Sequence, residues 1–217
     1  MPMPRPFIGA IIQARLTSTR LPRKHLLQVA GIPLLEHLIN RVRQCSLIDK
    51  IIIASPHNPE CCLNEEIFIG SENDVLDRYY QAAKKYQLDA VVRLTADCPF
   101  VPTSEIYRVV SRYLDGGCEY VTNVSRGSGR FGTPDGWDVE IFSMATLEEA
   151  NAYAKGDERE HVTPYMKKNC YPVFLEPLKL SVDTLEDFES VRKFYEGECL
   201  NYPKQTETLW SGQGKAF

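Results

Sequence analysis

The sequence predicts an α/β fold built on a doubly wound, mostly parallel β-sheet. Short continuous apolar runs alternate with amphipathic stretches along most of the 217 residues, which is the pattern of repeated βα units. Within the runs, apolar residues do not alternate with polar ones, as expected of strands covered on both faces. The length and the 43% hydrophobic content fit one large domain, residues 1–217, better than two small ones.

The order of the elements follows from these runs and from apolar residues at helical spacing. Apolar runs predict strands at 7–12, 50–55, 89–94, 118–123 and 138–142. Amphipathic stretches predict helices at 33–45, at 72–87 with Ser71 as N-cap, at 103–114 and at 143–154. One more strand and helix are expected within 179–196, before a polar tail over 200–217.

A Gly-rich segment, about 124–137, interrupts the alternation and is expected to be a loop insertion that carries substrate contacts. Its GSGRFG (127–132) satisfies the GxGxxG pattern of dinucleotide sites. That pattern requires a helix immediately afterwards, and the Thr-Pro-Asp-Gly that follows cannot begin one. We therefore reject a dinucleotide site.

Composition excludes several classes of protein. A formal net charge of −4 lacks the general basic character of nucleic-acid binders. Seven cysteines without a CxxC pair favour reduced thiols in a cytoplasmic protein. The N-terminal apolar run is too short for a signal peptide, and no stretch approaches the roughly 20 apolar residues that cross a bilayer. We expect no membrane partner and no nucleic acid.

Positive charge is nevertheless concentrated after the first strand, and no acidic residue precedes Glu36. Arg15, Arg20 and Lys24, with the Ser18 hydroxyl among their neighbours, follow the carboxyl end of a strand, where α/β sheets collect ligands. Guanidinium forks, an ammonium and hydroxyls suit a polyphosphate. The loop is not a Walker A sequence, and the alternative is that these charges are merely solvated.

Two aspartates also follow predicted strands. Asp97 comes directly after the run AVVRL, and Asp183 follows KLSV. Mg²⁺ binds through one or two carboxylates together with substrate phosphates, so the pair predicts a Mg²⁺ site beside the basic loop. For Asp183, three residues before Glu186, the alternative of a helix cap stays open.

Polar side chains that can contact a sugar lie in the second half of the chain. Asp135, Asp138 and Glu140 belong to DGWDVE, in which acidic residues flank the apolar Val139. The alternative for them is a turn and a solvated strand face. His161 is a further candidate for a substrate contact, and the alternative is a structural histidine.

Several stretches together resemble a known family. IIQARLTSTRLPRKHL resembles the N-terminal motif of the sugar-acid cytidylyltransferases, which make CMP-Kdo and CMP-sialic acids. The segments GSENDVLDRYYQAA, VVRLTADCPF, DGWDVEIF, REHVTPY and SVDTLEDFE are similar to the spore coat polysaccharide biosynthesis protein F branch, in the same order along the chain. The resemblance runs from about residue 8 to residue 195.

This resemblance implies a GT-A-like nucleotidyltransferase fold, often dimeric, that couples CTP to a sugar and releases pyrophosphate. By position, Arg15, Arg20 and Lys24 correspond to triphosphate contacts. Ala14 and Ser71 correspond to the base pocket. Asp97 and Asp183 correspond to ligands of the Mg²⁺ cofactor. These correspondences make Arg15, Arg20, Lys24 and Asp97 the expected catalytic residues, with Ser18 in the nucleotide site.

The chain departs from the family pattern in two places. Many members have Gly where this chain has Arg23, so the loop backbone is expected to differ or to gain a contact. The tail TETLWSGQGKAF has no counterpart. Two other functions stay open from the residues: a GT-A glycosyltransferase with DVE (138–140) as its metal motif, and a non-catalytic nucleotide-binding protein.

Overall fold

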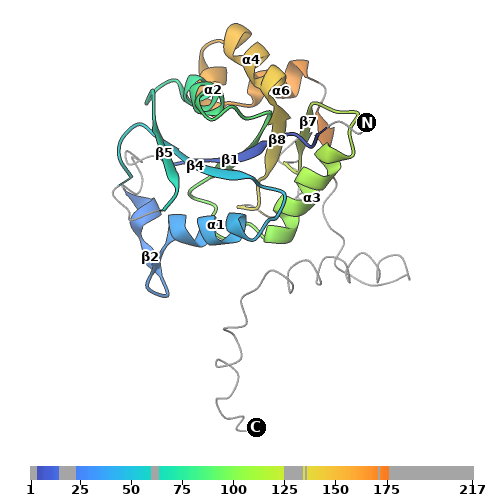
Figure 1. Ribbon diagram of the computed structural model, residues 1–217. Coiled ribbons are helices and arrows are strands. Elements are labelled where there is room, and N and C mark those ends of the chain that lie inside the picture. The colour runs from blue at the N-terminus through green and yellow to red at the C-terminus, as the bar shows by residue number, and fades with distance from the viewer. Residues whose placement is uncertain are drawn as a thin grey trace, which may run out of the picture. The chain divides into compact units, whose positions relative to one another are not determined.

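A seven-stranded sheet in the order β5-β4-β1-β6-β8-β7-β9 organises the fold (Figure 1). The computed structural model describes residues 4–14, 23–59, 64–124, 134, 136–170 and 172–175, all within one unit, residues 1–178. The strands are β1 Ile8–Gln13, β4 Lys50–Ser55, β5 Glu66–Ile69, β6 Ala90–Thr95, β7 Tyr120–Thr122, β8 Glu140–Ser143 and β9 Val173–Phe174. The strand and helix predicted within 179–196 lie outside the described residues.

Parallel pairing dominates the sheet, as predicted. β1 pairs in parallel with β4 and with β6, and β4 pairs in parallel with β5. β8 lies between β6 and β7 and runs antiparallel to both, while β7 and β9 are parallel. Among the described strands of the seven-stranded sheet, β8 is thus the one that reverses direction.

Helices cover both faces of this sheet, which confirms the doubly wound arrangement (Figure 1). They are α1 Leu34–Arg43, α2 Val75–Lys85, α3 Thr103–Leu114, α4 Met144–Tyr153, α5 Asp157–His161 and α6 Pro164–Asn169. The apolar sides of α1 and α3 pack on one face, and those of α2, α4 and α6 pack on the other. No helix in the described part of the chain is long and apolar enough to span a membrane.

The start of α2 differs from the prediction. The N-cap is Asp74, whose carboxylate accepts a hydrogen bond from the backbone N–H of Asp77 at 2.9 Å. Ser71 lies one turn earlier, and its Oγ accepts from the backbone N–H of Asp74 at 3.0 Å. Both residue types can cap a helix, so the sequence pattern did not distinguish them. Ser71 is therefore left on a loop at the end of β5.

Three short pairings were not predicted. One is the pairing of the two-residue strand β9 with β7. β5 is a four-residue edge strand that exists through its pairing with β4. β2 (Gln28–Val29) and β3 (Ile32–Pro33) form a hairpin between the 3₁₀ helix η1 (Lys24–Leu26) and α1. Its two loop residues, Ala30 and Gly31, have φ values of 52° and 78°, as a two-residue hairpin turn of type I′ requires. Strands this short carry too few residues for a periodic pattern.

A buried hydroxyl ties α2 to the centre of the sheet. Tyr79 is fully buried, and its Oη lies 3.2 Å from the carbonyl oxygen of Ile11 in β1 and 3.1 Å from that of Leu94 in β6. Burial raises the pKa of Tyr79 to about 12, so the hydroxyl keeps its proton and donates it to these carbonyls.

Tyr79→Phe is expected to lower the free energy of unfolding by about 0.5–1.5 kcal/mol, because the carbonyls lose a buried donor. Urea unfolding followed by circular dichroism measures the change. The matched control is Tyr80→Phe, one residue along α2, whose Oη makes a longer 3.4 Å contact with exposed Glu148. Equal loss in the two variants would contradict the role assigned to the Tyr79 hydroxyl.

Candidate active site

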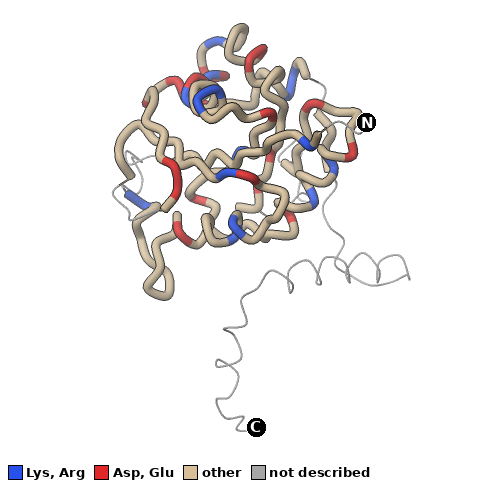
Figure 2. The backbone as a smooth tube through the Cα atoms, viewed as in Figure 1, with Lys and Arg blue, Asp and Glu red and all other residues tan. Residues whose placement is uncertain are grey.

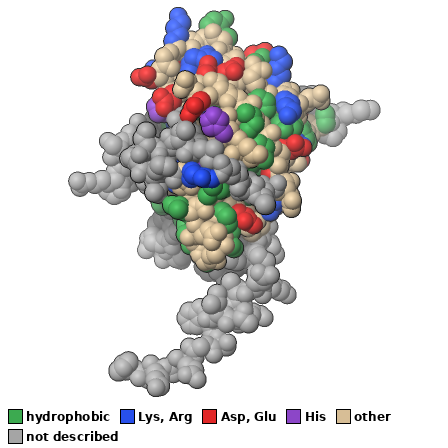
Figure 3. Space-filling model, turned by 90° about the vertical axis from the view of Figure 1, so that its left-hand side faces the viewer, with side chains coloured by type: hydrophobic (Ala, Val, Ile, Leu, Met, Phe, Trp, Pro, Cys, Tyr) green, Lys and Arg blue, Asp and Glu red, His purple; other side chains and the backbone are tan. Residues whose placement is uncertain are grey.

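The carboxyl ends of four parallel strands meet at one edge of the sheet, and three predicted site residues follow them. Ala14 follows β1, Ser71 follows β5 and Asp97 follows β6. The backbone N–H of Ala14 donates to the carbonyl of Ala54 at 3.1 Å, so the end of β1 lies directly beside the end of β4. Figure 3 looks toward this edge and shows histidine, basic and acidic side chains gathered on it.

Lys24 reaches Asp97 across this edge. Its Nζ lies 2.6 Å from Asp97 Oδ2, although the two residues are 73 positions apart in sequence. Lys24 is held by η1 just after the basic loop, and Asp97 by the turn after β6. The side chains are 33% and 48% exposed, so both remain accessible to a ligand. The sequence predicted both residues for the site, and the structure brings them into contact.

The carboxyl of Asp97 is ionised at neutral pH. Partial burial alone would raise its pKa, but hydrogen bonds from Lys24 and Thr95 and the Lys24 charge together bring the pKa below its usual value. An ionised, half-exposed carboxylate is a ligand that Mg²⁺ accepts.

The donor chemistry at this edge fits a divalent cation bound together with phosphates. A cationic group, the Lys24 ammonium, already lies against the carboxylate of Asp97. Across the described ranges, no group of three or more His, Cys, Asp or Glu residues could hold a metal by itself. An ion at Asp97 would therefore need further ligands, such as phosphate oxygens.

The backbone at Arg23 has a conformation that favours Gly. Arg23 has φ 55° and ψ 26°, the left-handed conformation that Gly adopts without steric cost. The arginine thus keeps a glycine-like backbone at the start of η1.

Five of the predicted site residues lie outside the described residues. They are Arg15, Ser18 and Arg20 of the basic loop, Asp135 of the middle loop and Asp183 near the end of the chain.

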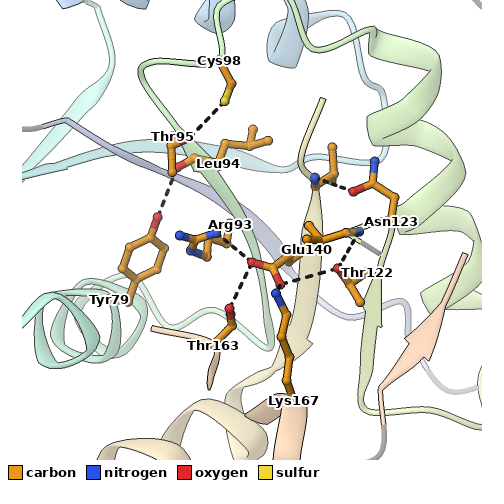
Figure 4. A network of polar contacts seen from close by, with 12 residues as sticks. Tyr79, Arg93, Leu94, Thr95, Cys98, Thr122, Asn123, Glu140, Thr163 and Lys167 are labelled. Atoms are coloured by element: carbon orange, nitrogen blue, oxygen red, sulfur yellow. Dashed lines mark hydrogen bonds and ion pairs between the residues drawn. The ribbon is translucent and has the colours of Figure 1, made fainter. Parts of the chain in front are cut away.

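Charged side chains in the antiparallel half of the sheet converge on Glu140, in β8 (Figure 4). Arg93 Nη1 lies 2.7 Å from Glu140 Oε2, and Lys167 Nζ lies 2.9 Å from Oε1. The Thr163 hydroxyl lies 3.2 Å from Oε2, and the Tyr120 hydroxyl donates to Oε1. We call these five residues the Glu140 cluster; it joins β6, β7 and β8 to α6 and to the residue before it.

Glu140 was predicted to be a sugar contact or a solvated residue, and it is neither exposed nor solvated. It is 1% exposed. Burial alone would raise its pKa, but Arg93 and Lys167 hold the pKa below its usual value, so the carboxylate is charged in the interior. A strand pattern cannot show that Glu140 faces the helices α2, α4 and α6 instead of water. The arginine in VVRL, an otherwise apolar run, was the available indication of a buried partner.

The other two predicted sugar contacts lie near this cluster in sequence. Asp138 is half-buried two residues before Glu140, and His161 is exposed at the end of α5. After His161, Val162 has φ 68° and ψ −55°, and the N–H of Thr163 donates to the His161 carbonyl at 2.8 Å. These values define a γ-turn of the rare, strained type. The Thr163 hydroxyl bonded to Glu140 helps to hold that turn.

A cavity of about 370 Å³ lies elsewhere, beside the ends of the sheet where β4 and β5 begin. Its charged walls are already paired, because Arg43 lies 2.6 Å from Glu65, and Lys50 lies 3.3 Å from Glu66. Basic and acidic residues are likewise interspersed over the described backbone (Figure 2). We place the candidate site at the carboxyl edge, where charged groups of distant segments meet.

Glu140→Gln is expected to lower the free energy of unfolding by about 3–5 kcal/mol at pH 7, because two cations then lose a buried anion. The control is Glu148→Gln, at an exposed position of α4. The folded pKa of Glu140 is depressed, so its contribution is fully present above the unfolded value of about 4.3. Chemical unfolding is measured from pH 7 to pH 3. The free energies of unfolding of the wild-type chain and of Glu140→Gln should converge as the pH falls through the folded pKa of Glu140. A constant difference down to pH 3 would contradict a charged Glu140.

Comparison with known proteins agrees with this architecture. A cytidylyltransferase family model matches residues 9–207. An uncharacterized protein of Methanocaldococcus jannaschii is 36% identical over 84% of this chain and 80% of its own length. Spore coat polysaccharide biosynthesis protein SpsF of Bacillus subtilis is 30% identical over 86% and 85%. The solved structure of a cytidylyltransferase from Leptospira borgpetersenii is 30% identical, with a TM-score of 0.68 and 84% of each chain covered.

A 3-deoxy-manno-octulosonate cytidylyltransferase of Anaeromyxobacter is also similar, at 31% identity over about half of each chain, 53% and 50%. These matches confirm the resemblance to the cytidylyltransferases and the predicted nucleotidyltransferase fold. The chain belongs to the cytidylyltransferase family and is a nucleotidyltransferase.

Proposed function

We propose that this nucleotidyltransferase is a Mg²⁺-dependent enzyme that transfers CMP from CTP to a sugar acid or related sugar, with release of pyrophosphate. The observation that carries the proposal is the Lys24–Asp97 pair, a cation and an ionised carboxylate 2.6 Å apart at the carboxyl edge of the sheet. The similarity to the spore coat polysaccharide protein of Bacillus subtilis supports a product used for surface polysaccharide.

In the proposed reaction, an oxygen of the acceptor attacks the α-phosphorus of CTP. The new O–P bond forms as the bond to the bridging oxygen breaks, pyrophosphate carries away the electron pair, and the acceptor hydroxyl loses its proton to solvent. Bound Mg²⁺ would neutralise charge on the phosphate oxygens. Lys24, with Arg15, Arg20 and Ser18, would bind the triphosphate, and Asp97 with Asp183 would hold the ion.

The remaining proposed contacts divide between the two substrates. Ala14 and Ser71 follow β1 and β5, at the carboxyl edge where Asp97 follows β6, and are proposed to meet the base. Asp135, Asp138 and His161 are proposed to contact the sugar. Glu140 is engaged by Arg93 and Lys167, and we propose that it shapes the sugar side of the site indirectly, by holding α6 against the sheet.

The geometry argues against the glycosyltransferase alternative. That function needs the acidic residues of DVE (138–140) as metal ligands. Glu140 is 1% exposed, and both of its oxygens are bonded to protein side chains.

A cytoplasmic location and a homodimer stay predictions.

Nucleotide choice tests the proposed function without knowledge of the acceptor. The melting temperature is measured with CTP, UTP, ATP, GTP and a nucleotide sugar, each with and without Mg²⁺. A ligand at 100 times its Kd adds about 2.7 kcal/mol, which raises Tm by roughly 5–10 °C in a domain of this size. A shift with CTP and Mg²⁺ alone supports the proposal. A shift with a nucleotide sugar but with no triphosphate would refute it.

Asp97→Asn is expected to lower turnover at least about 100-fold, because a neutral amide cannot supply the charge that the proposed ion needs. Stability should change by less than about 1 kcal/mol, since the Lys24–Asp97 pair is partly exposed. Pyrophosphate release measures turnover once an acceptor is found. Asp115→Asn, at the end of α3, is the control. An Asp97→Asn protein with wild-type turnover would remove Asp97 from the mechanism.

A further inference from the structure

A buried arginine lies directly behind the loop that carries Ser71. Arg78, in α2, is fully buried at 0% exposure, and its Nη1 donates to the backbone carbonyl of Ser71. A buried guanidinium is costly to desolvate unless it is hydrogen-bonded, so its position in the interior requires a compensating role. The contact fixes the carbonyl of a loop residue at the edge of the candidate site.

The neighbouring Gly70 leaves room for the side chain of this arginine because it has no Cβ. A Cβ at Gly70 would lie 2.9 Å from Cγ of Arg78 and 2.8 Å from Cε1 of Phe68, closer than carbon atoms approach. The N–H of Gly70 donates to the carbonyl of Ser55 at 3.1 Å, so the backbone cannot move away without breaking its bond to the end of β4. The aliphatic stem of Arg78 thus packs against bare backbone.

A second arginine holds the other end of the same loop. The carboxylate of Asp74, the cap of α2, accepts from Arg159 Nε at 2.7 Å. Arg159, in α5, also donates to the carbonyl and to the side-chain oxygen of Asn151, both at 2.8 Å. Asp74 in turn donates its N–H to Ser71 Oγ at 3.0 Å. Loop 70–74 is therefore anchored by α2 at one end and by α4 and α5 at the other.

These contacts set the direction of the Ser71 hydroxyl. Its oxygen already accepts from Asp74, so its proton points elsewhere, and the side chain is exposed at the carboxyl edge. A hydroxyl fixed in this way meets a ligand as a donor without first having to be ordered, which lowers the entropic cost of binding.

We propose that Arg78 and Arg159 are positioning residues for the nucleotide, which hold loop 70–74 so that Ser71 is preorganised to contact the base of CTP. The inference rests on the proposed function, because it names the residues that prepare the base side of that site. Neither arginine touches the nucleotide: Arg78 acts through the Ser71 carbonyl, and Arg159 acts through Asp74.

Isothermal titration of CTP in the presence of Mg²⁺ tests the inference on the full chain. Arg78→Met and Arg159→Gln are each expected to raise the Kd about tenfold or more, the loss that follows from removing a hydrogen bond from a charged donor. Arg78→Lys should recover part of the affinity, since an ammonium can still reach the Ser71 carbonyl. The Kd for CTP should therefore increase in the order wild type, Arg78→Lys, Arg78→Met. An arginine that only stabilised the fold would not produce this order among variants that are fully folded.

Matched controls separate loop positioning from general damage. Arg112→Met removes another arginine that donates to a backbone carbonyl, that of Gly116 at 3.1 Å, in the segment that leads into β7. Gly9→Ala, in β1, adds a methyl group against the side chain of Leu88, just as Gly70→Ala adds one against Arg78 and Phe68. Both controls should leave the Kd for CTP unchanged, and Gly70→Ala should raise it.

The outcomes distinguish this inference from the proposed function. If the wild-type chain binds CTP and the Arg78 and Arg159 variants bind it equally well, the positioning role is overturned and the proposed function stands. If the wild-type chain binds no CTP, both are overturned. Should Arg78→Met fail to fold, Arg159→Gln decides, because its arginine is 25% exposed and less embedded in the core.

Discussion

One buried carboxylate holds together the half of the sheet that departs from the parallel βα pattern. Glu140 lies in β8, the reversed strand, and it is bonded to Arg93 in β6 and Lys167 in α6. Charge in an apolar interior is tolerated only when oppositely charged groups and hydrogen-bond donors surround it. This requirement fixes where α6 docks and, through Thr163, how the chain turns after His161.

The other half of the sheet depends on strand direction. Because β1, β4, β5 and β6 are parallel, the residues that follow them lie at the same edge. Lys24 and Asp97 meet there, and the loop that carries Ser71 begins at the same edge, after β5. Backbone topology thus assembles polar residues from distant segments at the edge where α/β sheets collect ligands.

Interior arginines serve the two halves in different ways. Arg93 neutralises a carboxylate, whereas Arg78 bonds a backbone carbonyl beside a glycine that leaves it room. Both occur in segments whose other residues pack into the core. In each case the fold keeps a charged group inside because the group orders a polar feature that apolar packing could not specify.

The sequence by itself determined the alternation of strands and helices, the mostly parallel sheet, and Lys24 and Asp97 as site candidates. These predictions depend on periodicity and on position after a strand, which are local properties. Short elements such as β5, the cap at Asp74 and the burial of Glu140 were decided by tertiary structure. A four-residue strand exists only through its neighbour, and an acidic residue in a strand faces either water or the core according to what packs above it. The pairing of Arg93 and Lys167 with Glu140 likewise joins positions that are 74 residues apart in the chain, and no local pattern contains that distance.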